Sequence, residues 1–138
     1  MSKNRLKILL VDDDYLLAKG TAKLIERLGG HQVAITDKPD EIFQQCQSRA
    51  VDIVLMDVNL PEAVWDGKEV SGADLSKIIK NHPDMADMPI ILISAYAMVS
   101  ERQKLMEISL ADDFWPKPIS DYEALLGAIE SQVEKHLN

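Results

Sequence analysis

Short apolar runs alternate along the chain with longer segments of helical periodicity. The runs lie at 6–11, 32–36, 52–56, 89–94 and 111–115. Runs of this length, rich in Ile, Leu and Val and bounded by polar residues, predict β-strands. The first, third and fourth runs are apolar almost throughout, which is typical of parallel strands covered by helices on both faces. The pattern therefore predicts a five-stranded parallel sheet.

A helix is expected after each of the five strands. The first helical stripe consists of Leu17, Thr21, Leu24, Ile25 and Leu28. The paired glycines at 29–30 supply the C-terminal stop of this helix. Three further helices are expected at 39–48, 73–81 and 97–109. Strands and helices that alternate in this way predict a doubly wound α/β fold, in which ligands bind at the carboxyl ends of the strands.

The last helix has the clearest stripe and a candidate N-cap. Its apolar stripe consists of Tyr122, Leu125, Leu126, Ile129, Val133 and Leu137. Either Ser120 or Asp121 can cap its first turn, because both side chains carry an oxygen that accepts from a helical N–H. We therefore expect this helix to dock against the sheet through one face.

Length and charge narrow the class of protein. The 138 residues suit one domain over 1–138, and 23 acidic against 15 basic side chains give a net charge of −8. This balance disfavours direct binding to nucleic acid or to an anionic membrane, and no apolar stretch is long enough for a signal-peptide core or a membrane helix. The single cysteine, Cys46, excludes an internal disulfide. The three histidines are dispersed along the chain, which disfavours a His/Cys metal site. A cytoplasmic location is expected.

Acidic residues follow two of the predicted strands. Asp12, Asp13 and Asp14 follow the first strand, and Asp57, with Asn59 two residues later, follows the third. Carboxylates that converge at one sheet edge repel one another unless a cation neutralises them, and hard oxygen ligands suit Mg²⁺. An aspartate at a strand end can also be the N-cap of the next helix, and we favour that role for Asp14. A Mg²⁺ site is expected at Asp12, Asp13 and Asp57.

The fourth and fifth strands end in a hydroxyl and an ammonium group. Ser94 closes the fourth strand, and Lys117 follows the fifth, directly before Pro118. Either residue alone is a weak signal. Together with the carboxylates they match the needs of phosphoryl transfer, which are a metal site, a nucleophile and two groups that stabilise the phosphoryl oxygens.

Four segments in this order resemble the receiver domain of two-component response regulators. They are ILLVDDD at 8–14, IVLMDVNLP at 53–61, ILISA at 91–95 and DDFWPKP at 112–118. The resemblance implies a flavodoxin-like fold with strand order 2-1-3-4-5. It also implies that Asp57 accepts a phosphoryl group from a sensor histidine kinase or a phosphotransfer protein. Mg²⁺ would then be held by Asp12, Asp13, Asp57 and the main-chain carbonyl of Asn59.

The resemblance also implies a conformational switch. Ser94 would move toward the phosphoryl group, Lys117 would pair with it, and Phe114 would turn into the space that Ser94 leaves. The face formed by the fourth helix, fifth strand and fifth helix would then signal to a downstream protein or an output domain, or form a homodimer on phosphorylation. A cis Lys117–Pro118 peptide bond is expected, and Tyr96 would shield the phosphoaspartate from water.

One segment departs from the family pattern. Residues 62–71 form a long connection between the third strand and the third helix. Gly67 and Gly72 are both candidates for the family's loop glycine, and the helical spacing of Leu75 and Ile79 favours Gly72. This inserted loop is either a partial lid or partner contact with Trp65 as its anchor, or a tolerated surface insertion with Trp65 folded against its own loop.

Other functions remain open on the sequence alone. The chain also fits the receiver fragment of a longer regulator with an output domain, or a receiver used only as a phosphate-independent binding module. A phosphatase of the haloacid dehalogenase type would need an aspartate where Asn59 stands. A flavodoxin-like electron carrier would need a phosphate-binding loop where the three aspartates stand. A non-enzymatic receiver is the favoured interpretation.

Overall fold

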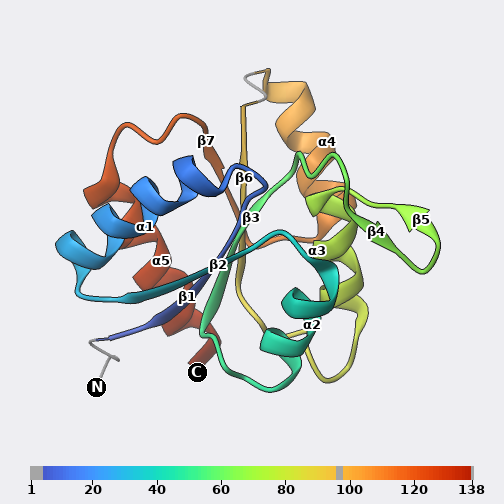
Figure 1. Ribbon diagram of the computed structural model, residues 1–138, viewed down its shortest axis with the longest axis horizontal. Coiled ribbons are helices and arrows are strands. Elements are labelled where there is room, and N and C mark those ends of the chain that lie inside the picture. The colour runs from blue at the N-terminus through green and yellow to red at the C-terminus, as the bar shows by residue number, and fades with distance from the viewer. Residues whose placement is uncertain (1–4, 96–97, 138) are drawn as a thin grey trace.

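The predicted parallel sheet is present in the computed structural model, which describes residues 5–95 and 98–137 (Figure 1). Its strands are β1 (Lys7–Val11), β2 (Gln32–Thr36), β3 (Ile53–Asp57), β6 (Ile90–Ser94) and β7 (Asp113–Pro116). All neighbouring pairs are parallel, and the spatial order is β2-β1-β3-β6-β7. This confirms the expected order, because β4 and β5 belong to a separate hairpin. The largest shift is in the last strand, which begins at Asp113 and not at 111.

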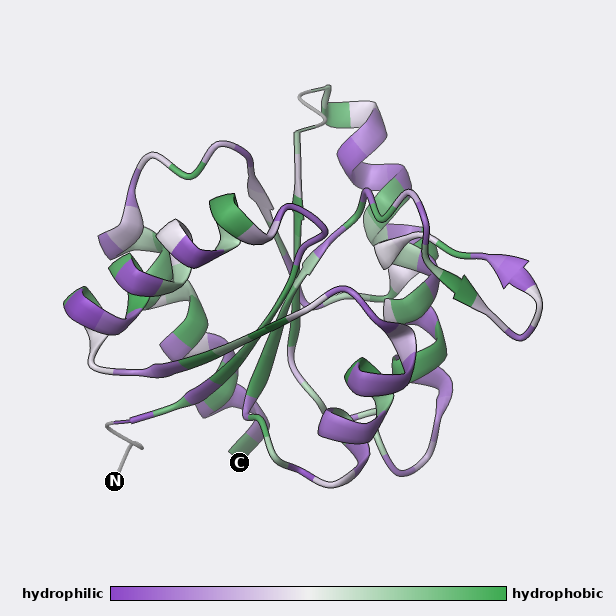
Figure 2. Cartoon of the chain, in the orientation of Figure 1, coloured by the Kyte–Doolittle hydropathy of each residue, from purple (hydrophilic) through white to green (hydrophobic). Residues whose placement is uncertain are grey.

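Helices cover both faces of this sheet. They are α1 (Tyr15–Gly29), α2 (Pro39–Gln47), α3 (Gly72–Asn81), α4 (Val99–Ser109) and α5 (Tyr122–Leu137). Helices α1 and α5 lie on one face, and α2, α3 and α4 lie on the other (Figure 1). Alternate strand residues point to opposite faces, so Ile8 and Leu10 join one hydrophobic cluster while Leu9 and Val11 join the other. The central strands are correspondingly hydrophobic over most of their length (Figure 2). Among the described helices, none is both long and apolar enough to span a membrane.

The predicted buried stripe of α1 is correct at Ile25 but wrong at its three leucines, and the helix and its end are correct. Leu17, Leu24 and Leu28 are 56%, 41% and 56% exposed. The buried side chains are Ala18, Ala22 and Ile25. These follow an i, i+4, i+7 spacing of their own, and the two alanines allow the helix backbone to lie close to the sheet. Leucines on the neighbouring stripe are therefore turned toward solvent.

Helix α5 docks largely as predicted. Leu125, Leu126, Ile129 and Val133 are buried against the sheet, whereas Leu137 in the last turn is 63% exposed. The N-cap is Asp121, whose Oδ1 accepts from the backbone N–H of Ala124 at 3.0 Å. The predicted stripe is therefore wrong only at Leu137, in the final turn of the helix.

Residues 62–71, which were predicted to be an inserted loop, contain a β-hairpin. Strands β4 (Val64–Trp65) and β5 (Lys68–Glu69) pair antiparallel, and the hairpin extends sideways from the molecule (Figure 1). The two turn residues, Asp66 and Gly67, have φ angles of 53° and 76°. Positive φ at both central positions defines a type I′ turn, for which Asp-Gly is a favoured pair. This dipeptide was therefore a readable hairpin signal.

Trp65 anchors this hairpin to the body of the protein. Its ring packs edge-on against Phe43 of α2, with centroids 4.5 Å apart and planes at 65°. Trp65 and Val70 both contact the core cluster that lies under α2 and α3. The tryptophan is therefore partly buried against another helix, and is not packed against its own loop alone.

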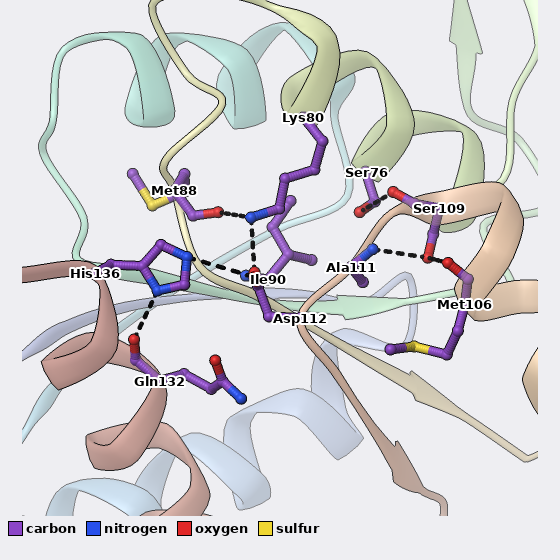
Figure 3. Close-up of polar contacts among 10 residues, drawn as sticks. All are labelled: Ser76, Lys80, Met88, Ile90, Met106, Ser109, Ala111, Asp112, Gln132 and His136. Atoms are coloured by element: carbon purple, nitrogen blue, oxygen red, sulfur yellow. Dashed lines mark hydrogen bonds and ion pairs between the residues drawn. The ribbon is translucent and has the colours of Figure 1, made fainter.

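A partly buried polar network connects several elements at the amino ends of β6 and β7 (Figure 3). Lys80 Nζ, from the end of α3, donates to the main-chain oxygen of Met88 at 2.6 Å and to Asp112 Oδ2 at 2.7 Å. The same carboxylate oxygen accepts from Ile90 N at 2.8 Å, while His136 Nε2 of α5 lies 3.4 Å from Asp112 Oδ1. Asp112 therefore joins α3, β6 and α5, a role that the sequence analysis did not predict.

Candidate functional site

The carboxyl ends of β1, β3, β6 and β7 meet at one edge of the sheet (Figure 1). An open pocket of about 600 Å³ lies there. Its walls are formed by Asp12, Asp13, Asp14, Leu17, Asp57, Asn59, Ser94, Ala95 and Lys117. The fold thus brings together the predicted acceptor, metal and phosphate-binding residues. Phe114 lies outside this lining, on β7.

The three aspartates between β1 and α1 have different structural roles. Asp14 is the N-cap of α1, and its Oδ1 accepts from Leu17 N at 3.1 Å. Asp12 Oδ1 accepts from Asp14 N at 2.9 Å, which fixes the turn. This confirms the capping role of Asp14. Leu17, which the sequence analysis placed in the core, lies on the pocket wall because the cap directs the first turn of α1 there.

Three carboxylates converge in the pocket. One oxygen from each of Asp12, Asp13 and Asp57 lies within 4.8 Å of the others. Asp12 and Asp57 are buried and Asp13 is exposed. The backbone N–H of Asn59 donates to Asp57 Oδ1 at 3.1 Å, which orients the carboxylate. A cluster of hard oxygen donors with one exposed side fits a divalent cation that retains some of its water.

Lys117 supplies the positive charge in this cluster. Its Nζ lies 2.6 Å from Asp57 Oδ2 and 3.1 Å from Asp12 Oδ2. The Lys117–Pro118 peptide bond is cis, which confirms the prediction. The backbone N–H of Lys117 donates to the main-chain oxygen of Ser94 at 2.9 Å, which links the ends of β6 and β7.

Burial and ion pairing act against each other on these groups. Burial raises the pKa of the Asp57 carboxyl, and Lys117 offsets this shift only in part. Burial alone would lower the pKa of Lys117, but hydrogen bonds to Asp57 and Asp12 outweigh it, so this pKa is also raised. The lysine is therefore held in its charged form beside the carboxylate that it partners.

The predicted switch residues occupy adjoining strands. Ser94 is buried at the end of β6, and Phe114 is half-buried in β7 opposite Leu92. Tyr96, which was expected to shield the phosphoaspartate, lies outside the described residues. The structure therefore places Ser94 in the pocket and the Phe114 ring beside the neighbouring strand.

Gly72 brings the start of α3 against the acceptor strand. Its N–H donates to the main-chain oxygen of Val58 at 2.8 Å. A Cβ atom at this position would lie 1.9 Å from the main-chain oxygen of Asp57, where no side chain fits. The close approach is the physical reason for a glycine here.

The hairpin contributes no residue to the lining described for this pocket. Because Trp65 instead packs on α2, we predict that Trp65→Ala lowers the free energy of unfolding by about 2 kcal/mol. Loss of an aromatic contact with the core is the cause, and urea denaturation measures it. The rate of phosphorylation of Trp65→Ala by a small phosphodonor should differ from wild type by less than twofold.

A matched control for this substitution lies in the same short strand. Val64 is 53% exposed, so Val64→Ala should change stability by less than about 0.5 kcal/mol. Equal losses in the two variants would contradict the anchoring role of Trp65. A large drop in phosphorylation of the folded Trp65→Ala variant would instead restore the lid interpretation.

Comparison with known families gives one match over most of the chain. The model of the response regulator receiver domain matches residues 8–130. This span includes the pocket residues and the hairpin.

Individual relatives are longer proteins. An uncharacterised 76.5 kDa protein of Thiocystis violacea is 32% identical over 126 residues, which cover 91% of this chain and 17% of that protein. The gliding motility regulatory protein of Myxococcus xanthus is 28% identical and is covered to 15%. The transcriptional regulatory protein GltR of Pseudomonas aeruginosa is 31% identical and is covered to 48%. The chain thus spans less than half the length of these relatives.

Solved structures share the fold. A CheY-like response regulator receiver domain protein from Methanospirillum hungatei has a TM-score of 0.72 at 24% identity, with 95% of each chain covered. The receiver domain of a sensor histidine kinase from Pseudomonas aeruginosa PAO1 has a TM-score of 0.75 at 20% identity, with 94% and 98% covered. In that neighbour a magnesium ion is coordinated in the active-site cleft.

Proposed function

Because the chain belongs to the response regulator receiver family, whose general function is to accept a phosphoryl group, we propose that Asp57 is its acceptor. The contact that carries this proposal is the 2.6 Å ion pair between Lys117 Nζ and Asp57 Oδ2. It places a cation on a buried carboxylate that faces a solvent-accessible pocket. Receiver domains are signalling modules, and we propose that one phosphoryl group is taken up per chain.

The transfer requires an in-line attack by a carboxylate oxygen of Asp57 on the phosphorus of a donor. The new O–P bond forms as the donor's P–N or P–O bond breaks, and the leaving group retains the bonding electrons. Lys117 would then contact the phosphoryl oxygens, and Ser94 would donate its hydroxyl to them. The backbone N–H of Asn59 holds Asp57 in position during the attack.

Asp12, Asp13 and Asp57 would hold Mg²⁺, with the main-chain carbonyl of Asn59 as a further ligand. Bound there, the ion would neutralise charge on the phosphoryl oxygens. The clustered carboxylate oxygens, within 4.8 Å of one another, support this assignment.

The phosphodonor would be a sensor histidine kinase or a phosphotransfer protein in the cytoplasm. Ser94 and Phe114 would relay phosphorylation to the face of α4, β7 and α5, which would contact a downstream protein, an output domain or a second copy of the chain. The chain would act either as a single-domain regulator, with 62–71 as its insertion, or as a receiver within a longer protein, and the greater length of the relatives supports the second of these. The net charge of −8 argues against direct nucleic-acid binding by this domain.

Intact-mass spectrometry after incubation with acetyl phosphate and Mg²⁺ tests the proposal. One phosphoryl adduct is expected, and it should disappear in Asp57→Asn and in a chelated sample. Asp14→Asn is the matched control, because asparagine also caps helices and the adduct should remain. Absence of an adduct on the folded wild-type chain, or its persistence in Asp57→Asn, would overturn the assignment.

A further inference from the structure

Arg102 of α4 covers the ring of Phe114. Its guanidinium carbon lies 5.5 Å from the ring centroid, which is within the range of a cation–π contact. Within the described part of the chain, no carboxylate lies at ion-pair distance from Arg102. Among the described residues, the Phe114 ring is therefore the side-chain partner of the Arg102 guanidinium.

The contact joins β7 to a helix that is weakly attached to the sheet. Of the described α4 residues, only Ser109 in the last turn is buried. That end is fixed by the hydroxyl of Ser76, which donates to the main-chain oxygen of Ser109 at 2.9 Å (Figure 3). At the other end, the N-cap Met98 makes no side-chain capping bond. Leu105 and Met106 in the middle of α4 pack against the core cluster, and Arg102, in the first half of the helix, lies over Phe114.

The ring of Phe114 also adjoins the core. Phe114 packs on the hydrophobic cluster that contains Leu92, its partner across β6 and β7. Ser94 lies two residues beyond Leu92 and closes the same strand. A ring that turned toward the space beside Ser94 would leave the guanidinium, because the cation lies over its present position.

We propose that Arg102 is a positioning residue that holds Phe114 in its half-buried position and so opposes the switch. This proposal rests on the proposed function, since it assigns a restraint to the switch that phosphorylation would drive. The switch would have to break the contact between Arg102 and Phe114. This cost would lower the apparent affinity of the pocket for a phosphoryl group or its mimic. An exposed cation–π contact corresponds to about a two- to fivefold effect on such an equilibrium.

Titration with beryllofluoride, a phosphoryl mimic that binds carboxylates, tests this role. The probe is the ¹⁹F signal of 4-fluorophenylalanine at Phe114, assigned by its loss in Phe114→Leu, and Phe43 supplies an internal reference. Arg102→Gln should bind beryllofluoride about two- to fivefold more tightly than wild type and shift the Phe114 signal before any ligand is added. Arg102→Lys retains a cation and should restore part of the wild-type behaviour.

Lys104→Gln removes the same charge from an exposed site on α4 and is the matched control. It should behave as wild type. The inference is overturned if Arg102→Gln binds like wild type, or if Lys104→Gln tightens binding equally, because net charge would then be the cause. A folded wild-type chain that binds no beryllofluoride would overturn the proposed function, whereas binding that is insensitive to Arg102 would overturn only this inference.

Discussion

Replacing Gly72 by alanine is expected to lower the free energy of unfolding by about 3 kcal/mol. The added Cβ would lie 1.9 Å from the main-chain oxygen of Asp57 and 2.8 Å from its carbonyl carbon. Both contacts are with backbone, so neither can be relieved by rotation of a side chain. The start of α3 must move away from β3, and the Gly72–Val58 hydrogen bond of 2.8 Å must lengthen or break. Urea denaturation at neutral pH measures the loss.

The same substitution at Gly127 provides the control. This glycine lies in α5, and a Cβ there would meet nothing within 4 Å. Gly127→Ala should therefore stabilise the protein by about 0.5–1 kcal/mol through helix propensity. A Gly72→Ala variant as stable as wild type would show that α3 can shift without cost. The close approach would then not be the reason for glycine.

Removing the amino group of Lys80 is expected to destabilise the protein by about 2–3 kcal/mol. The side chains of Lys80 and Asp112 are only 8% and 21% exposed. Lys80→Met preserves the length of the side chain but leaves the Asp112 carboxylate without its 2.7 Å cation. It also removes the donor that reaches the main-chain oxygen of Met88. Denaturant unfolding compared with wild type gives the difference.

Two variants separate the loss of this ion pair from a general effect of substitution in α3. Lys77→Met alters an exposed lysine one turn earlier and should change stability by less than about 0.5 kcal/mol. Adding Asp112→Asn to Lys80→Met should recover part of the loss, because a neutral amide can still accept from Ile90 N. If the double variant were less stable than Lys80→Met, the loss of the lysine from the Asp112 carboxylate could not be the main cost.

The sequence was most informative at the strand ends. Asp12, Asp57 and Lys117 could be placed together because the carboxyl ends of parallel strands share one edge of the sheet. The face that α1 buries could not be chosen in this way, since its leucines and its alanines form competing stripes. Large apolar side chains are the stronger signal in a pattern, but close approach to the sheet selected Ala18 and Ala22.

The sequence pattern also does not predict ion pairs between residues that are far apart in the chain. Lys80 and Asp112 are 32 residues apart, and each alone resembles an ordinary charged surface residue. By contrast, the Asp66-Gly67 turn is a local signal, because both residues adopt the positive φ that a type I′ hairpin turn requires. The position of Arg102 over Phe114 depends on how α4 crosses β7, which periodicity does not specify.

The two ion pairs of Lys117 can form only late in folding. Its partners Asp12 and Asp57 lie 105 and 60 residues earlier in the chain. Contacts at such separations require closure of long loops, so the complete pocket forms only after β7 has joined the sheet. During translation, the aspartates leave the ribosome well before the lysine does. A nascent chain therefore presents these two carboxylates without their cation until synthesis has passed the last strand.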